Sequence, residues 1–466
     1  MIADAPAYSP ARRLVVLCLL CLAFFVDVLG STSVFTASPE LARGLGLTQA
    51  GLQWSFTAAT LPAGALLLVG GRLADLFGRR RLFLIGLALL TASSLACGLA
   101  GSATQLIAAR AGQGVAGALL IPAALSLLTG TFPEGRERNR AVAAWSAIGG
   151  IGATAGLLIG GLITAGAGWQ WVFLINVPIG VVLLALGRFL LPEPPRVIES
   201  RRVDLPGSIT ITGGLALFIY GVSQIPSVGW ASWRSIGAIM AGVAVLALFA
   251  RIEAGASEPM LPRAVIRNRS VVAGNLVLLV AGMCVDGLLF TLTLYTQRQL
   301  GYGPLEFGAL TAIMTVVSAA AAGVAQRAVG RFGPRAVAAV GLGFLTVTCP
   351  VFAVAASAAL GMPALVTGMI TFGIGMGFAF VAGSVAALAG IPERDAGAAA
   401  AVQSISFTVG TTLGVAVFST ASAAAASYTA GFVTGAVVAG LGLAGMLLLW
   451  RSNRVATRLA SMARQP

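Results

Sequence analysis

The chain has 466 residues, of which 58% are hydrophobic and only 9% are charged, and its formal net charge is +14. A soluble protein needs about a quarter of its residues charged to cover its surface, so this composition excludes a water-soluble globular domain and predicts a chain embedded in lipid. All 29 basic residues are arginines, and there is no histidine. P-loop ATPases, Schiff-base enzymes, Ser-His-Asp hydrolases and His-ligated zinc sites are therefore excluded. We expect no enzyme activity, cofactor or metal.

Fourteen apolar stretches are long enough to cross a bilayer as helices, allowing for a few shortened ends. In chain order they lie at 14–36, 52–69, 82–98, 105–128, 142–165, 173–191, 207–222, 236–249, 271–295, 308–325, 336–355, 364–389, 397–420 and 432–450. The first follows Arg12 and Arg13 and is longer than the core of a signal peptide. We therefore expect an uncleaved first span.

The arginines predict the orientation of these spans. With both termini in the cytoplasm, 25 arginines lie on the cytoplasmic side, as the positive-inside rule requires. Only Arg43, Arg234 and Arg298 fall outside, and Arg110 lies within a span. Because the inner arginines are spread a few per loop, topology and anionic lipid explain the charge better than nucleic acid does. Arginine without lysine, together with abundant Ala and Gly, hints at a GC-rich bacterial genome, so we expect a multi-pass protein of a bacterial cell membrane.

A faint internal repeat predicts the domain organisation. The sequence LFGRR at 76–80 matches RFGPR at 331–335, at an offset of 255 residues, and both follow the second helix of a six-helix unit. We therefore expect an all-α membrane fold with a six-helix bundle at 1–192, a linker and an inserted helix pair at 193–260, and a second six-helix bundle at 261–466. Repeated bundles of this kind are typical of secondary transporters.

The inner loop at 71–81, GRLADLFGRRR, resembles the loop signature of the major facilitator superfamily. Glycine allows close helix approach and tight turns, and an aspartate can bond a helix N-terminus or an arginine across the bundle. The resemblance implies a conformational latch formed by Gly71, Asp75, Gly78, Arg79 and Arg80. A charged loop that only sets the topology is the alternative.

The fourth predicted span contains the sequence RAGQG at 110–114, which resembles the arginine motif of proton-coupled members of that superfamily. An arginine inside lipid costs at least roughly 3 kcal/mol, so Arg110 needs a partner. Gln113 and Gly114 lie on the same helical face, which indicates that this face points into the bundle. The alternative is that Arg110 snorkels to the outer surface.

The fifth span carries a stripe of small residues at the spacing that lets membrane helices touch. We expect Gly152, Gly156, Gly160 and Gly161 to pack against another helix. The stripe resembles the antiporter motif of exporters, except that Leu157 stands where that motif has a proline. A helix without this proline kinks less, so the direction of transport is less firmly implied.

Two further segments resemble the fourteen-helix drug:H⁺ antiporter branch. They are WQWVFLINVPIG at 169–180 and DLPG at 204–207. The branch usually has an aspartate in the first span, where this chain has Gly30. The carboxylate lies one helical turn earlier, at Asp27.

Asp27 and Asp286 are the two acids that we expect deep in the spans, each in the first helix of a six-helix unit. A repeat axis would place them on opposite sides of one central cavity, in the same layer as Arg110. Access to water and pairing with an arginine would tune their affinity for protons. We therefore expect Asp27, Asp286 and Arg110 to couple transport to protons. Permanently neutral packing residues are the alternative.

Residues near the two acids are expected to line a substrate cavity: Phe24, Ser31, Phe35, Gln113, Phe290, Thr293 and Gln297. Carboxylates beside aromatic rings suit a lipophilic cation. The sequence thus predicts a proton-coupled exporter of lipophilic drugs or antibiotics that works by alternating access, with one chain sufficient for function. A symporter or an exporter of another small molecule or lipid on the same fold stays open, as does a non-transporting membrane sensor or scaffold.

Overall fold

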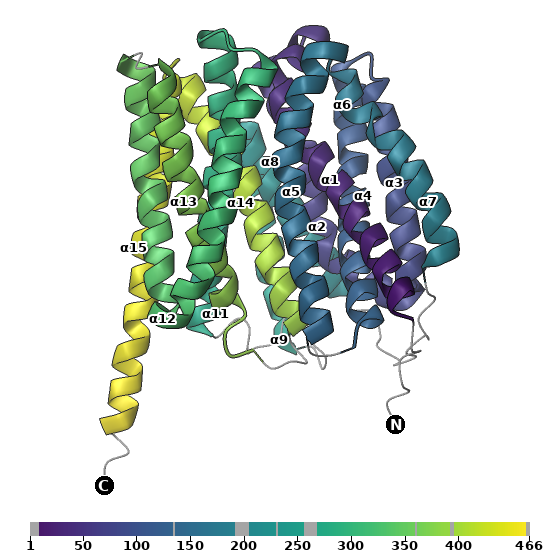
Figure 1. Cartoon of the computed structure of the whole chain (residues 1–466). Coiled ribbons are helices and arrows are strands. Elements are labelled where there is room, and N and C mark those ends of the chain that lie inside the picture. The colour runs from purple at the N-terminus through teal and green to yellow at the C-terminus, as the bar shows by residue number, and fades with distance from the viewer. Residues whose placement is uncertain are drawn as a thin grey trace. The chain divides into compact units, whose positions relative to one another are not determined.

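The computed structural model describes residues 9–133, 136–191, 205–229, 232–255, 268–358, 361–391 and 396–462. These residues form helices joined by short turns, and no strand occurs among them (Figure 1). The chain divides into two compact units. Unit 1 comprises Met1–Thr212 and Thr296–Ala312, and unit 2 comprises Gly213–Tyr295 and Ile313–Pro466.

The helices of unit 1 begin where the sequence offers hydrogen-bonding caps. They are α1 (Pro10–Gly44), α2 (Gln49–Phe77), α3 (Arg79–Gly98), α4 (Ala103–Thr131), α5 (Arg136–Ala167), α6 (Gln170–Leu174) and α7 (Asn176–Leu190). The hydroxyls of Ser9, Thr48 and Ser102 accept hydrogen bonds from main-chain N–H groups of α1, α2 and α4. Such caps satisfy donors that the first helical turn leaves without an intrahelical partner.

Helix α8 (Leu205–Val228) crosses from unit 1 into unit 2. The other elements are α9 (Trp233–Gly255), α11 (Arg269–Leu294), the π-helix η1 (Tyr295–Gln299), α12 (Pro304–Ala358), α13 (Gly361–Ala387), α14 (Ala396–Ala424) and α15 (Tyr428–Met462). Of these, Thr296–Ala312 belongs to unit 1. The predicted linker that follows α7 lies outside the described residues at 192–204.

Glycine allows a close approach between two helices in each unit. In unit 1, a Cβ on Gly156 of α5 would lie 2.7 Å from the carbonyl oxygen of Leu29 in α1, and one on Gly152 would lie 3.3 Å from that of Phe25. In unit 2, a Cβ on Gly414 of α14 would collide with the main chain of α11 at Met283. Small residues allow this approach, which strengthens van der Waals contact between membrane helices.

The internal repeat has a backbone counterpart. Gly78, between α2 and α3, has φ 95° and ψ 127°, and Gly333, inside α12, has φ 79° and ψ 160°. Glycine adopts this positive φ without steric cost, and each glycine follows an exposed phenylalanine, Phe77 or Phe332. The 55 residues of α12 are therefore two helical arms that meet at Gly333.

Twelve segments of the described chain are long and apolar enough to cross a membrane, and one of them runs through both arms of α12. Several helices extend beyond the predicted spans. Helix α1 continues to Gly44, because Pro39 is accommodated inside it. The predicted sixth span begins with the short helix α6, and the chain turns at Ile175 before α7.

Candidate transport site

A hydrogen-bonded network surrounds Arg110 in unit 1. The side chain of Arg110 is 2% exposed; its Nε donates to the carbonyl oxygen of Ser55 at 2.9 Å, and its Nη1 donates to Oε1 of Gln113 at 2.8 Å. Gln113 in turn donates from Nε2 to the hydroxyl of Ser94 at 2.9 Å. The network joins α2, α3 and α4, so protein groups hold the guanidinium inside the unit.

Asp27 faces this network from α1. Its half-buried carboxylate interacts electrostatically with Arg110. Gly117 in α4 leaves room for the acid, because a Cβ there would lie 3.3 Å from Oδ1 of Asp27. Asp27, Arg110 and Gln113, which the sequence predicted as site residues, therefore lie in one region of unit 1.

The aromatic side chains predicted near Asp27 have different surroundings. Phe24 stacks on Trp145 of α5, with ring centroids 4.4 Å apart and an interplanar angle of 5°. Phe35 is buried against Phe56 of α2, with centroids 4.6 Å apart. Phe24 is half-buried beside the acid, whereas Phe35 packs between helices. Trp145 was not predicted as a site residue, because its contact with Phe24 joins two helices and no local pattern encodes it.

Ser31 and the predicted packing glycines of α5 have different surroundings. Ser31 is exposed on α1. Gly160 contacts the same helix, since a Cβ on it would lie 2.6 Å from Cβ of Ser33. Gly161 instead faces the start of α12, where a Cβ would lie 2.5 Å from the carbonyl oxygen of Pro304. Gly160 therefore packs against α1, whereas Gly161 packs against α12.

In unit 2, Asp286 of α11 is half-buried and forms a side-chain hydrogen bond with Thr411 of α14. The hydroxyl of Thr411 also lies 2.9 Å from the carbonyl oxygen of Thr408. Phe290 and Thr293, predicted as cavity residues, are both 1% exposed and lie inside the unit. Asp286 thus interacts with the hydroxyl of Thr411, whereas Asp27 interacts with the guanidinium of Arg110.

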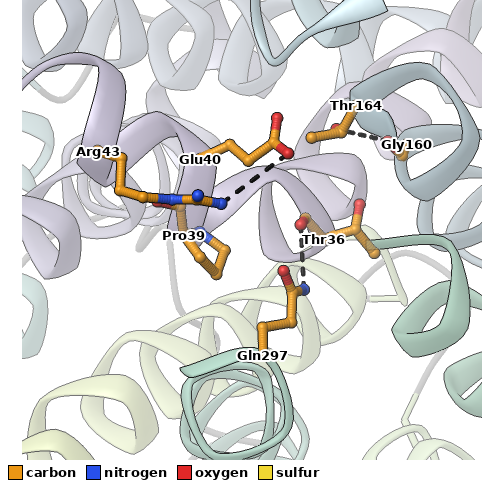
Figure 2. Close-up of polar contacts among 7 residues, drawn as sticks. All are labelled: Thr36, Pro39, Glu40, Arg43, Gly160, Thr164 and Gln297. Carbon is orange, nitrogen blue, oxygen red and sulfur yellow. Dashed lines mark hydrogen bonds and ion pairs between the residues drawn. The ribbon is translucent and has the colours of Figure 1, made fainter. Parts of the chain in front are cut away.

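Gln297 lies away from the Arg110 network. Its Nε2 donates to the main-chain carbonyl oxygen of Thr36 at 3.1 Å, beside Pro39 of α1 (Figure 2). Thr36 is nine residues beyond Asp27, which is roughly 13 Å along the helix. The sequence places Gln297 among the cavity residues near the acids, but Gln297 belongs to the π-helix η1, whose wider turn changes the direction of the side chains.

The same end of unit 1 carries an ion pair and a further close approach between helices. Arg43 lies 4.0 Å from Glu40, and its Nε donates to the carbonyl oxygen of Pro39 at 3.4 Å (Figure 2). A Cβ on Gly308 of α12 would lie 2.6 Å from the carbonyl oxygen of Leu157. Leu157, which replaces the expected proline, is therefore covered by a glycine of α12.

The residues of the predicted latch are only partly described. Arg79 donates to the carbonyl oxygen of Ser126 at 3.4 Å, and Arg80 donates to that of Arg188. Gly71 lies near Pro122, with 3.9 Å between a Cβ on it and Cβ of the proline. The side chain of Asp75 lies outside the described part of the chain.

One buried acid was missed. Glu253 of α9 is 6% exposed, although the predicted span ended at residue 249. Helix α9 continues past the apolar stretch, and Glu253 lies two residues before its end, so it does not bear on the expectation that Asp27 and Asp286 lie deep in the spans. Among the described residues, no group of three His, Cys, Asp or Glu side chains could hold a metal ion.

Comparisons with known proteins identify the family. The sequence profile of the Major Facilitator Superfamily matches residues 20–303 and 274–465. Over 412 residues, covering 86% of this chain and 80% of the relative, the chain is 36% identical to the puromycin resistance protein pur8 of Streptomyces alboniger. It is 31% identical to the multidrug resistance protein Stp of Mycobacterium tuberculosis (strain CDC 1551 / Oshkosh) over 410 residues, 88% of this chain and 75% of that protein.

A solved structure agrees with this assignment at the level of the fold. The peptide transporter POT in complex with sulfate superposes with a TM-score of 0.71 at 17% identity, covering 95% of both chains. The relatives are bacterial drug and antibiotic exporters, and the family consists of multi-pass membrane transporters rather than enzymes. This chain belongs to the Major Facilitator Superfamily.

Proposed function

We propose that the protein is a proton-coupled exporter of lipophilic drugs or antibiotics that works by alternating access. The observation that carries this proposal is the half-buried Asp27, which interacts with the buried Arg110 among helices of membrane length. Charged groups at membrane depth are costly and mark ion or substrate pathways. The names of the two relatives, a puromycin resistance protein and a multidrug resistance protein, favour drugs as the substrate class.

Exchange of a proton for a substrate at the carboxylates would couple proton entry to substrate export. A proton and a substrate would compete for Asp27 and for Asp286, so that substrate loading releases a proton and proton entry releases the substrate on the other side. Arg110, fixed by Ser55 and Gln113, would stabilise the ionised form of Asp27. When two protons exchange for one monovalent cation, one net charge moves inward, and one charge moved through 100 mV supplies about 2.3 kcal/mol, or a roughly fiftyfold concentration gradient, which suffices for export without ATP.

The substrate would be a flat, lipophilic molecule, and a cation would suit the site best. Phe24 lies one helical turn before Asp27 and stacks on Trp145. An aromatic ring beside a carboxylate attracts a cation through its π face and through charge. The stacked pair would also give an aromatic drug a rigid apolar surface.

Alternating access requires an end of the site to close. The hydrogen bond from Gln297 to Thr36 and the contact of Gly308 with Leu157 lie at the ends of α1 and α5 that follow the Asp27 level. With both termini cytoplasmic, this is the outer end. These contacts would then belong to a state closed to the outside, and they would break when the transporter opens outward.

A fourteen-span topology accompanies this proposal. The two arms of α12 on either side of Gly333 count as two spans, and α2 is long enough to be another. The inserted pair α8 and α9 lies between the two six-helix bundles in the sequence. An even number of spans keeps both termini on the arginine-rich side.

Transport by purified protein in lipid vesicles tests the function. A pH gradient should drive ethidium, a lipophilic aromatic cation, across the membrane, and D27N and D286N should each weaken this transport. The double variant should abolish it. The matched control is E137Q, which removes an exposed acid paired with Arg13 and should change the rate by less than about twofold. Undiminished gradient-driven transport in the double variant would refute the assignment of the acids.

A further inference from the structure

The turn at Gly333 in unit 2 presents three arginines and one aromatic ring. Arg327 and Arg331 are exposed near the end of the first arm of α12, and Arg335 is half-buried in the first turn of the second arm. Phe332 is 63% exposed, and the guanidinium carbon of Arg331 lies 5.3 Å from the centre of its ring. We call residues 327–335 the Gly333 turn.

The equivalent turn in unit 1 differs in charge. At the repeat offset of 255 residues, Asp75 corresponds to Gly330, and Leu76 corresponds to Arg331. The Gly333 turn has therefore lost the acid of the first repeat and gained an arginine beside its phenylalanine. The sequence from 307 to 392 contains no acidic residue, so neither α13 nor α12 beyond its first turn supplies a counter-charge.

The arginines of the two turns also differ in their partners. Arg79 and Arg80 of unit 1 donate to main-chain carbonyls of α4 and α7. In the described part of the chain, the side chains of Arg327, Arg331 and Arg335 form no hydrogen bond or ion pair. Arg331 makes a cation–π contact with the ring of Phe332. Among the described residues, no acid pairs with these three guanidinium groups.

Topology and helix dipoles explain only part of this cluster. Positive charges in inner loops fix the orientation of spans, and arginines near a helix C-terminus, such as Arg327 and Arg331, are favoured by its dipole. Arg335 has the opposite position. It follows Pro334 at the start of the second arm, where the helix dipole disfavours a positive charge and favours a bound anion.

We propose that the Gly333 turn binds the phosphate headgroup of an anionic phospholipid in the adjoining leaflet. Guanidinium groups form bidentate hydrogen bonds with phosphate oxygens. Phe332 would lie at the boundary between headgroups and acyl chains, as amphipathic and aromatic side chains do in membrane proteins. Exposed apolar residues on both arms, Val324 and Val340, would contact the acyl chains. A lipid fits better than a free phosphate because the turn joins two membrane-length arms.

Native mass spectrometry of the full-length protein in detergent tests this site. The probes are palmitoyl-oleoyl phosphatidylglycerol and the zwitterionic phosphatidylcholine with the same chains. The wild type should bind the anionic lipid more tightly than the zwitterionic one. Each arginine near a charged surface contributes roughly fivefold, so R331Q/R335Q should weaken binding of the anionic lipid by roughly thirtyfold. R331K/R335K, which keeps both charges, should retain most of the affinity.

The matched control is R234Q/R298Q, which also removes two exposed arginines, one of them 5.6 Å from an exposed aromatic ring. These arginines lie at the predicted outer ends, and their loss should leave phosphatidylglycerol binding within about twofold of the wild type, since a distant charge is screened beyond roughly 10 Å. An equal loss in both double variants, or equal affinity for both lipids, would overturn the proposal. Complete displacement of the lipid by millimolar inorganic phosphate would overturn it too, because the site would then recognise the free anion. If R331Q/R335Q does not fold, R335Q alone decides, with an expected loss of about fivefold.

Discussion

Gln297 donates a 3.1 Å hydrogen bond to the main-chain carbonyl of Thr36, although 261 residues separate them in the sequence. The bond joins η1 to the turn of α1 that contains Pro39 (Figure 2). Pro39 has no N–H group, so this turn of α1 has one main-chain hydrogen bond fewer than a regular helix. The hydrogen bond from Gln297 therefore stabilises this turn of α1.

Removing this amide should loosen the end of α1. A neutral hydrogen bond contributes about 0.5–1.5 kcal/mol, so Q297L should raise the population of the opened end by roughly three- to tenfold. Hydrogen exchange of the main-chain amides at 36–43 measures the change. The control is Q299L, because Gln299 is an exposed glutamine of the same π-helical turn. Equal exchange in Q297L and Q299L would contradict a role for the bond.

The glycine contacts of α5 predict a sharp difference between two alanine variants. G156A places a methyl group 2.7 Å from the carbonyl oxygen of Leu29, whereas G150A meets no atom within 4 Å. Overpacking of this kind costs about 1–3 kcal/mol, while alanine on an open helix face is neutral or slightly stabilising. Thermal unfolding in detergent should therefore show a lower midpoint for G156A alone. Similar midpoints for both variants would show that α1 and α5 can separate at little cost.

Replacing Arg110 by lysine should be damaging although the charge is kept. The planar guanidinium donates hydrogen bonds to Ser55 and Gln113 from two different nitrogens. The ammonium group of lysine, on its flexible side chain, cannot reproduce this geometry. We expect R110K to lower gradient-driven transport at least about tenfold, while R140K, at an exposed arginine of α5, stays near the wild-type rate. Wild-type transport by R110K would mean that charge alone suffices at this position.

The stacked pair in unit 1 should affect substrate preference more than stability. F24L removes the ring that would contact an aromatic substrate, and an aromatic contact contributes about 0.5–1.5 kcal/mol beyond its buried area. The apparent affinity for ethidium should fall about two- to tenfold, and that for an aliphatic quaternary ammonium should fall less. L22A is a control on an exposed site of the same helix. Equal losses for both substrates would argue against an aromatic contact.

Local sequence patterns predicted much of the fold and part of the site. Apolar length predicted the helices, the two glycine turns predicted the repeat, and the spacing of three residues placed Arg110 and Gln113 on one helical face, where the structure joins them by a hydrogen bond. These features depend on periodicity within one helix. The family assignment of the loop and helix motifs was confirmed by the comparisons.

Contacts between distant helices could not be read in the same way. The partner of Gln297 depends on the wider turn of η1, which shifts the register that a regular helix would give. Trp145 became part of the site through a contact between α5 and α1 that no local pattern encodes. The burial of Glu253 was not predicted, because a hydropathy criterion ends a span at the first charged residues. Helix α9 continues beyond that point, and Glu253 is buried on it.

The exchange of a proton for a substrate at the membrane carboxylates is tested most directly by proton release. Purified protein in weakly buffered detergent solution, followed with a pH-sensitive dye, should release protons when ethidium is added. D27N/D286N should release none, and E137Q should match the wild type. Equal release from the wild type and D27N/D286N, or substrate binding without any change in pH across the range from 5 to 8, would contradict the account.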